Sequence, residues 1–265
     1  MMFSLHNLTK VFTVGFFRRR AVKAVNNVSF ELDKGEIISL VGESGSGKTT
    51  TVLMILRLIR PTSGEIFFEG KNIFKLKTGE ERKKYWRQVH GIFQDPYAPF
   101  NPMYRVDRVL YQVFNLYDKQ PSKKEKDQIV KESLSAVGLI PKDILGKYSH
   151  QLSGGQRQRI MVARCYILKP KLILADEPVS MIDASTRAGV IKLFMKLCND
   201  LKTSVMFITH DLGLAYYTSN RILIMRRGEI VEEASAKSLL EHPQHPYTKR
   251  LLNDVPLLYS KWKDL

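Results

Sequence analysis

Cysteines and long apolar runs are both scarce in this 265-residue sequence. The two cysteines, Cys165 and Cys198, each stand in an apolar, helix-like stretch, without CxxC spacing or a nearby pair of histidines. This excludes a disulfide framework or a zinc site as the expected basis of the fold and favours a reducing, cytosolic environment. No run reaches the ~18 apolar residues that span a bilayer, and residues 1–10 lack the apolar core of a signal peptide. We expect a soluble chain, or one that something else holds at a membrane.

Acidic residues are also few relative to basic ones, 26 against 42, which gives a formal net charge of +16. Such an excess favours an anionic partner, whether nucleic acid, ribosome, acidic lipid or nucleotide. A solvated basic surface explains it equally well, because the positive residues are spread over many segments rather than gathered in one arm. The charge alone therefore does not identify a partner.

Short β-prone runs alternate with helical stretches along much of the chain. Strands are indicated at 36–42, 64–70, 172–176, 204–209 and 221–225, and helices at 49–59, 185–201 and 211–219. This alternation predicts an α/β protein with a mainly parallel sheet covered by helices on both faces. The opening residues 3–32 are β-rich, whereas the amphipathic stretches 77–88 and 122–137 predict a helical sub-lobe in the middle of the chain. From Ala236 the chain is helical and then broken by prolines.

A glycine-rich loop, GESGSGKT at 42–49, follows one predicted strand and opens a predicted helix. Its spacing, GxxxxGK[ST], in this context is that of a phosphate-binding loop. The glycines let backbone N–H groups turn inward, and the helix directs its positive end at the phosphates. Lys48 supplies a charge for the β and γ phosphates, and the Thr49 hydroxyl is expected to bind Mg²⁺. The loop therefore predicts nucleotide binding.

An apolar strand, LILADEP at 172–178, ends in two carboxylates. Ligands collect at the carboxyl ends of strands in open α/β sheets. Asp176 is placed to hold Mg²⁺ through water, and Glu177 to accept a proton from the attacking water or to orient it. An Asp-Glu pair alone is as often a simple turn. Beside a phosphate loop, the pair predicts nucleotide hydrolysis.

A second anion-binding helix start is indicated by LSGGQ at 152–156. Ser153 is the expected N-cap, and the two glycines after it allow backbone N–H groups close to an anion. One γ phosphate does not need two such cradles from one subunit. We therefore expect Ser153 to Gln156 to cover the nucleotide bound to a partner subunit.

These motifs and their order resemble the ATP-binding cassette (ABC) ATPase family over nearly the whole chain. The resemblance implies that Gln94, in IFQDP, approaches Mg²⁺, and that His210, in FITHD, contacts the γ phosphate. SMID at 180–183 corresponds to the D-loop; its middle residues depart from the usual SALD, but Asp183 is kept. Phe12 is placed like the aromatic that stacks on adenine, although Phe16 or Phe17 could do so instead.

The resemblance implies a P-loop NTPase with a mainly parallel sheet core, an N-terminal antiparallel β subdomain and an inserted helical subdomain. The expected segments are 1–94 for the β subdomain and first core part, 95–165 for the helical subdomain with the signature, 166–235 for the second core part and 236–265 for a C-terminal extension. The expected catalytic residues are Glu177 and His210. The expected site residues are Phe12, Gly42, Glu43, Ser44, Gly45, Ser46, Gly47, Lys48, Thr49 and Thr50 for ATP; Thr49, Gln94 and Asp176 for Mg²⁺; and Ser153, Gly154, Gly155, Gln156 and Asp183 for the partner's ATP.

Within the family, the runs VGESGSGK, IFQDPYAPFNPM and YSHQLSGGQRQRI and the tail HPQHPYTKRLL resemble the oligopeptide/dipeptide importer group. That group implies ATP-driven transport with two transmembrane permease subunits, a paralogous second ATPase and an extracytoplasmic solute-binding protein, at the cytoplasmic face of the membrane. Oligosaccharides and nickel are alternative cargoes. Some members carry a C-terminal iron–sulfur cluster, but no cysteine follows Cys198, so we expect none here.

Three other readings are weaker on the sequence. A chromosome or repair ATPase would separate its two nucleotide motifs by a long coiled coil, and no sustained heptads lie between Lys48 and Asp176. A soluble factor acting on the ribosome or nucleic acid would usually carry two cassettes in one chain. A non-enzymatic binding subunit would not need Glu177 and His210. We expect no nucleic-acid partner.

Overall fold

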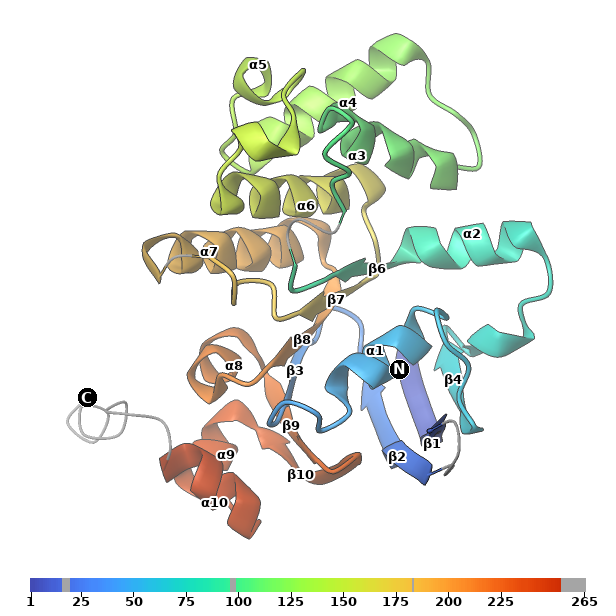
Figure 1. Ribbon diagram of the computed structural model, residues 1–265, viewed down its shortest axis with the longest axis vertical. Coiled ribbons are helices and arrows are strands. Elements are labelled where there is room, and N and C mark those ends of the chain that lie inside the picture. The colour runs from blue at the N-terminus through green and yellow to red at the C-terminus, as the bar shows by residue number, and fades with distance from the viewer. Residues whose placement is uncertain (16–19, 96–98, 183, 254–265) are drawn as a thin grey trace. The chain divides into compact units, whose positions relative to one another are not determined.

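The computed structural model describes residues 1–15, 20–95, 99–182 and 184–253. The chain divides into two compact units, Met1–Lys75 with Val205–Leu265, and Leu76–Ser204. We call them the first and the second unit, and Figure 1 labels their helices and strands.

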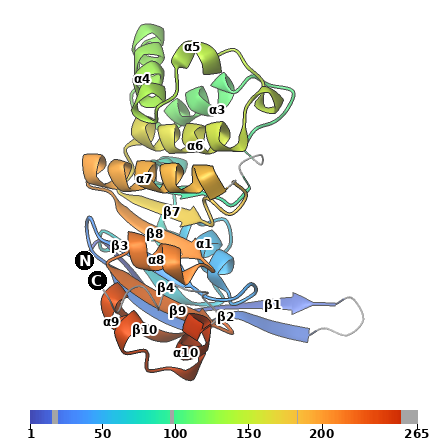
Figure 2. The same ribbon diagram turned by 90° about the vertical axis from the view of Figure 1, so that its left-hand side faces the viewer.

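The first unit opens with an antiparallel sheet in the order β2-β1-β4-β5. Its strands are β1 (Phe3–Val14), β2 (Arg20–Leu32), β4 (Ser63–Phe68) and β5 (Lys71–Asn72), and a 3₁₀ turn, η1 (Ile73–Lys75), follows. Along β2 the apolar residues Val28, Phe30 and Leu32 are buried and alternate with exposed ones, as expected when one sheet face covers a core. β1 and β2 form a long hairpin (Figure 2). The predicted antiparallel β subdomain is thus confirmed.

The first unit also contains the strand order β10-β9-β3-β8. These strands are β3 (Ile37–Val41), β8 (Ser204–Thr209), β9 (Arg221–Arg226) and β10 (Glu229–Ser235). β3 runs parallel to both β8 and β9, and all residues of β3 and β8 are buried, as in strands covered on both faces. In register, Val41 lies opposite Thr209 on one side and Ile224 on the other. The loops after β3 and β8 therefore leave the sheet at the same edge.

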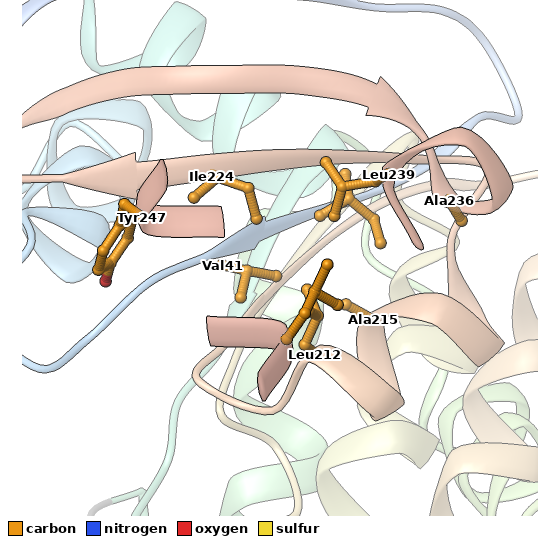
Figure 3. Packing of buried hydrophobic residues seen from close by; sticks show 9 residues of the cluster. Val41, Leu212, Ala215, Ile224, Ala236, Leu239 and Tyr247 are labelled. Carbon is orange, nitrogen blue, oxygen red and sulfur yellow. The ribbon is translucent and has the colours of Figure 1, made fainter. Parts of the chain in front are cut away.

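Four helices accompany these strands. They are α1 (Lys48–Ile55), α8 (Leu212–Thr218), α9 (Ala236–Glu241) and α10 (Pro246–Asn253). Buried side chains from α8, α9 and α10 meet Val41 at the end of β3, with Leu212, Leu239 and Tyr247 among them (Figure 3). The C-terminal helices are thus packed into the core of the first unit.

The second unit holds the parallel pair β6 (Val89–Ile92) and β7 (Leu172–Asp176) and most of the helices. The helices are α2 (Gly79–Gln88), α3 (Asp107–Tyr111), α4 (Lys123–Ala136), α5 (Pro141–Ile144), α6 (Gly154–Leu168) and α7 (Ala184–Leu201), with 3₁₀ turns η2 (Gln112–Leu116) and η3 (Ser149–Gln151). α3, α4 and α5 gather on one side of α6, and α7 lies along its other side (Figures 1 and 2). The predicted helical sub-lobe is present.

Local sequence signals explain where these helices begin. Thr78 with Glu81, Ser122 with Glu125 and Ser153 with Gln156 form capping boxes at α2, α4 and α6. Cys165 and Cys198 are buried in α6 and α7, where burial raises the pKa of each thiol to about 12. Within the described ranges, no helix combines the length and apolarity required to cross a membrane.

Candidate functional site

The glycine-rich loop between β3 and α1 can be formed only with glycine at two of its positions. A Cβ atom on Gly42 would lie 2.1 Å from the carbonyl oxygen of Met225. Gly47 has a φ of +108°, and a Cβ there would lie 2.3 Å from the carbonyl oxygen of Ala24. The N–H of Gly228 donates to the carbonyl of Ser46 at 2.8 Å. The loop therefore packs closely against β2, β9 and the β9–β10 turn, and these contacts fix its backbone conformation.

Lys48 is buried beneath this loop, with a relative exposure of 6%. Its Nζ donates to the carbonyl oxygens of Gly42 at 2.6 Å and of Glu43 at 2.8 Å, and lies 3.4 Å from Ser46 Oγ. These oxygens take the place of water around the buried ammonium. The role of Lys48 in holding the β and γ phosphates stays a prediction.

The start of α1 is open in another respect. Gly47 is the N-cap and has no side chain to accept a hydrogen bond from the first N–H groups of the helix, and the first turn carries no acidic residue. The N–H groups at a helix start need acceptors, and oxyanions satisfy them well. Thr49 is exposed in this first turn, so its hydroxyl is accessible to a metal ion at the phosphates. These features fit a nucleoside polyphosphate.

The other predicted loop residues surround this cradle. Glu43, Ser44 and Gly45 are exposed, Ser46 is buried, and Thr50 is half-buried in α1. The N–H of Glu43 donates to the Tyr247 hydroxyl at 3.1 Å. Their role as nucleotide ligands stays a prediction.

His210 lies at the same edge of the sheet as the phosphate loop. It follows Thr209 of β8, which pairs with Val41 of β3 immediately before Gly42. The turn is fixed by the N–H of Asp211, which donates to Thr209 Oγ1 at 2.9 Å, and Asp211 in turn caps α8. The first unit therefore brings the phosphate loop and His210 to neighbouring strand ends.

The second unit brings together the acidic pair and Gln94 in the same manner. Asp176 is the last residue of β7 and is buried at 6% exposure, and Gln94 follows β6 and is exposed. β6 and β7 are parallel, with Ile92 opposite Ala175, so both residues leave the sheet at one edge.

Glu177 adopts a strained backbone conformation. Its φ is +45°, in the left-handed region that costs a non-glycine residue about 1–3 kcal/mol. Ser180 holds the turn, because its N–H and its Oγ both donate to the Glu177 carbonyl, at 3.2 and 3.1 Å. Arg187 supports the next residues through the carbonyls of Ser180 and Ile182. These contacts hold the Glu177 backbone in its left-handed conformation directly after β7.

The signature segment forms the start of α6. Ser153 Oγ accepts the N–H of Gln156 at 3.2 Å, and Gln156 Oε1 accepts the N–H of Ser153 at 2.9 Å. The predicted N-cap is confirmed. The two glycines differ: a Cβ on Gly155 would lie 2.7 Å from Thr186 Cγ2, whereas one on Gly154 would meet nothing nearer than the Met181 carbonyl at 4.0 Å. Gly155 therefore permits packing against α7, and only Gly154 is left open to an approaching anion.

Phe12, the aromatic expected to stack on adenine, lies on β1. It is 37% exposed, and Lys10 Nζ lies 5.0 Å from its ring centroid. Phe16, Phe17 and Asp183 lie outside the described residues. The choice among the aromatics and the role of Asp183 stay predictions.

The described residues include no cluster of three or more His, Cys, Asp or Glu side chains that could hold a metal ion alone. Mg²⁺ needs no such cluster when it binds with a nucleotide, because phosphates and water supply most of its ligands. The Thr49 hydroxyl and the Asp176 carboxylate are oxygen donors of the kind that Mg²⁺ takes.

The sequence pattern of the ABC transporter family matches residues 25–180, more than half of the chain. The chain belongs to the ABC transporter family. The matched segment contains the phosphate loop, Gln94, the signature and the acidic pair. The chain is therefore an ABC-type ATPase, and the P-loop NTPase fold predicted from the sequence is confirmed.

Relatives of this ABC protein include oligopeptide transport ATP-binding proteins. The oligopeptide transport ATP-binding protein OppF of Bacillus subtilis is 44% identical over 239 residues, which cover 90% of this chain and 78% of OppF. AppF of the same organism, also an oligopeptide transport ATP-binding protein, is 40% identical over 96% of this chain and 78% of its own length. Among solved structures, the dimeric bacterial ABC transporter cassette MJ0796 matches with a TM-score of 0.79 and 29% identity, covering 89% of this chain and 99% of that one.

The sequence reasoning missed several residues that shape the site. Ser180 lies in the SMID run, but its hydrogen bonds to the Glu177 carbonyl were not predicted. Arg187 supports the residues that follow, and no local pattern marks it. Tyr247 belongs to no phosphate-binding motif, yet its hydroxyl contacts the phosphate loop from the C-terminal extension. The HPQHPY run marked the extension but gave no role for its tyrosine.

Proposed function

We propose that this chain is the ATP-hydrolysing subunit of an importer of oligopeptides or of a related solute such as oligosaccharides. The observation that carries the hydrolytic part is the buried Lys48 beneath the uncapped start of α1. The left-handed turn at Glu177 supports it. The transport part rests on the relatives named as oligopeptide transport ATP-binding proteins, which this chain matches over nine-tenths of its length.

In this proposal the first unit binds the nucleotide. Lys48 and the N–H groups of the loop hold the β and γ phosphates, and Phe12 stacks on adenine. Mg²⁺, when bound, neutralises phosphate charge, and Thr49, Gln94 and Asp176 are the residues that would hold it. Glu177 accepts a proton from the attacking water or orients it, and His210 contacts the γ phosphate.

Hydrolysis requires a second cassette in this proposal. Ser153, Gly154, Gly155, Gln156 and Asp183 cover the ATP bound to that subunit. We infer a paralogue rather than an identical chain, as in the group the tail resembles. The dimeric structure of the cassette MJ0796 supports pairing. Closure of the pair would drive two transmembrane permease subunits at the cytoplasmic face of the membrane, supplied by an extracytoplasmic solute-binding protein.

The permease contact is proposed for the loop after Gln94. Phe100, Tyr104, Arg108 and Val109 line a pocket in the second unit, and Met103 beside it is largely exposed. The Arg108 guanidinium lies 3.8 Å from the Tyr104 ring centroid, which sets a cation beside an aromatic wall. Such a socket suits a short amphipathic helix of a membrane subunit. Tyr97 of the same loop lies outside the described residues.

The segments proposed from the sequence, 1–94, 95–165, 166–235 and 236–265, describe functional parts rather than compact units. The helical segment carries the pocket and the signature, and the last segment carries the C-terminal extension. No iron–sulfur cluster is proposed, because the sequence has no cysteine after Cys198.

The experiment is purification of the native complex from detergent-solubilised membranes, followed by mass spectrometry of the co-purifying proteins. Two multi-span membrane proteins and a second cassette ATPase are the expected result. Ribosomal proteins or nucleic acid without membrane subunits would favour a soluble ABC-type ATPase and contradict the transport proposal.

A further inference from the structure

The C-terminal extension has a contact with the phosphate loop that neither hydrolysis nor the proposed assembly uses. Its helices α9 and α10 bury Leu239, Tyr247 and Leu252 in one cluster with Val41 (Figure 3). Val41 is the last residue before Gly42, the first glycine of the loop. The extension therefore packs against the residue from which the phosphate loop starts.

The turn between α9 and α10 is built around one carboxylate of β10. Glu232 Oε1 accepts the N–H of Gln244 at 2.7 Å, and Glu232 Oε2 accepts the N–H of His245 at 3.0 Å. His245 Nδ1 then accepts the N–H of Tyr247 at 3.1 Å. Partial burial opposes ionisation of Glu232, but these N–H groups outweigh it and lower its pKa. The HPQHPY run therefore has a structural purpose, which is to fix the position of Tyr247.

The Tyr247 side chain extends from this fixed turn to the loop. Its ring is 3% exposed, and the Arg226 guanidinium lies 4.8 Å from the ring centroid. Its hydroxyl oxygen accepts the N–H of Glu43 at 3.1 Å. Burial raises the pKa of Tyr247, so the hydroxyl stays neutral at physiological pH. Arg250 of α10 lies 3.9 Å from the Glu43 carboxylate, but both side chains are exposed and this pair adds little.

The contact falls on the same peptide group that Lys48 holds. The carbonyl of Gly42 and the N–H of Glu43 belong to one peptide unit; Lys48 Nζ donates to that carbonyl at 2.6 Å, and Tyr247 accepts from that N–H. A phosphate that attracts Lys48 weakens the first of these two bonds. The second bond does not depend on Lys48 and keeps the peptide plane in place while the lysine engages the ligand.

We propose that Tyr247 is a positioning residue of the nucleotide site, through which the C-terminal extension holds the phosphate loop in its binding conformation. The proposal rests on the proposed binding of ATP at this loop. Under this proposal, any movement of the turn that Glu232 holds also moves the Tyr247 hydroxyl. Binding of a partner to the C-terminal extension would therefore change the affinity of the phosphate loop for nucleotide.

The test compares full-length wild-type protein with Tyr247→Phe, which removes the hydroxyl and keeps the buried ring. Tyr217→Phe removes a hydroxyl from an exposed ring on α8 of the same unit and is the matched control. Affinity is measured by titration with a fluorescent non-hydrolysable ATP analogue. Exchange of the Glu43 amide hydrogen is measured by NMR in nucleotide-free protein, and kcat and KM are measured from phosphate release.

Tyr247→Phe is expected to raise the Kd for the analogue about threefold to tenfold, the range of one neutral hydrogen bond. The Glu43 amide should exchange faster, KM for ATP should rise in parallel, and kcat should stay within about twofold of wild type, because no reacting group is touched. The control variant should match wild type throughout. Unchanged affinity together with unchanged Glu43 exchange would overturn the inference.

A second variant tests the link through the turn. Glu232→Ala removes both acceptors of the turn and is expected to raise the Kd by a similar factor, with no further rise when combined with Tyr247→Phe. Additive effects in the double variant would overturn the link. Wild-type protein that fails to bind the analogue would overturn the proposed function as well, whereas wild-type binding with an unaffected Tyr247→Phe overturns only the role of the tyrosine.

Discussion

The starts of α1 and α6 are both glycine-containing helix termini, yet the chain builds them differently. At α1, within the described part of the chain, no side chain caps the helix, and a buried lysine lies beneath the loop. At α6, Ser153 and Gln156 satisfy each other's backbone N–H groups in a capping box. The first terminus has no side-chain cap, whereas the second has one that also leaves space beside Gly154. This difference suits a loop that binds its own nucleotide and a signature that is presented, preformed, to another subunit.

The largest expected effect comes from removing the cation at α1. Lys48→Ala should lose ATP binding outright, because charge-assisted hydrogen bonds to phosphate are the strongest single interactions the loop can offer. Binding of a fluorescent ATP analogue to purified protein measures this, with Lys71→Ala, an exposed lysine on β5, as the control. Retained affinity in Lys48→Ala would contradict the account of the α1 terminus.

The next effect separates binding from hydrolysis. Glu177→Gln should reduce turnover by about a hundredfold or more, the usual contribution of a general base, and leave ATP affinity near that of wild type. Loss of turnover should be accompanied by a closed pair of cassettes that accumulates with ATP, which size-exclusion chromatography of the complex detects. Near-normal ATPase activity in this variant would remove Glu177 from its role.

A third variant tests the α6 terminus against a matched cap elsewhere. Ser153→Ala and Ser122→Ala each remove an N-cap serine from a capping box, at α6 and α4 respectively. Each should lower the free energy of unfolding by about 1 kcal/mol, measured by urea denaturation. Only Ser153→Ala should also lower ATPase activity of the assembled complex, by about tenfold or more, while ATP binding to the isolated chain is unchanged. Equal ATPase activities in the two variants would show that Ser153 is a cap and nothing else.

The smallest effect distinguishes the two signature glycines. Gly155→Ala should destabilise the protein by about 1–3 kcal/mol, because its Cβ would clash with Thr186. Gly154→Ala has room for its Cβ and should leave the unfolding transition within about 0.5 kcal/mol of wild type. Thermal unfolding followed by circular dichroism measures both. The reverse order of stabilities would contradict the packing described for α6 and α7.

Much of the fold was predictable because its core strands are short apolar runs with clear boundaries. The strands at 172–176 and 204–209 match the prediction residue for residue. β6 and β10 were missed for physical reasons: β6 is four residues long and contains His90 and Gly91, and β10 carries three glutamates and has no fully buried residue. Pairing with a neighbouring strand, which a single sequence does not display, makes them strands.

The site was predictable where a local motif carries the chemistry. The phosphate loop, the acidic pair and the Ser153 cap each depend on neighbours within a few residues. Contacts between distant segments gave no such signal, as with Tyr247 on the loop 204 residues earlier in the chain. The sequence likewise did not show why position 155 needs a glycine, because the side chain that a Cβ there would meet, Thr186, belongs to the next helix.

The most direct test of the account uses Met181, which is 56% exposed and whose carbonyl lies beside Gly154. A diazirine side chain is introduced at position 181 of the native complex, and its photo-crosslinks are mapped by mass spectrometry with and without ATP. The account predicts an ATP-dependent crosslink to a second cassette subunit. Crosslinks confined to this chain, or independent of ATP, would contradict the claim that the α6 terminus acts on another subunit's nucleotide.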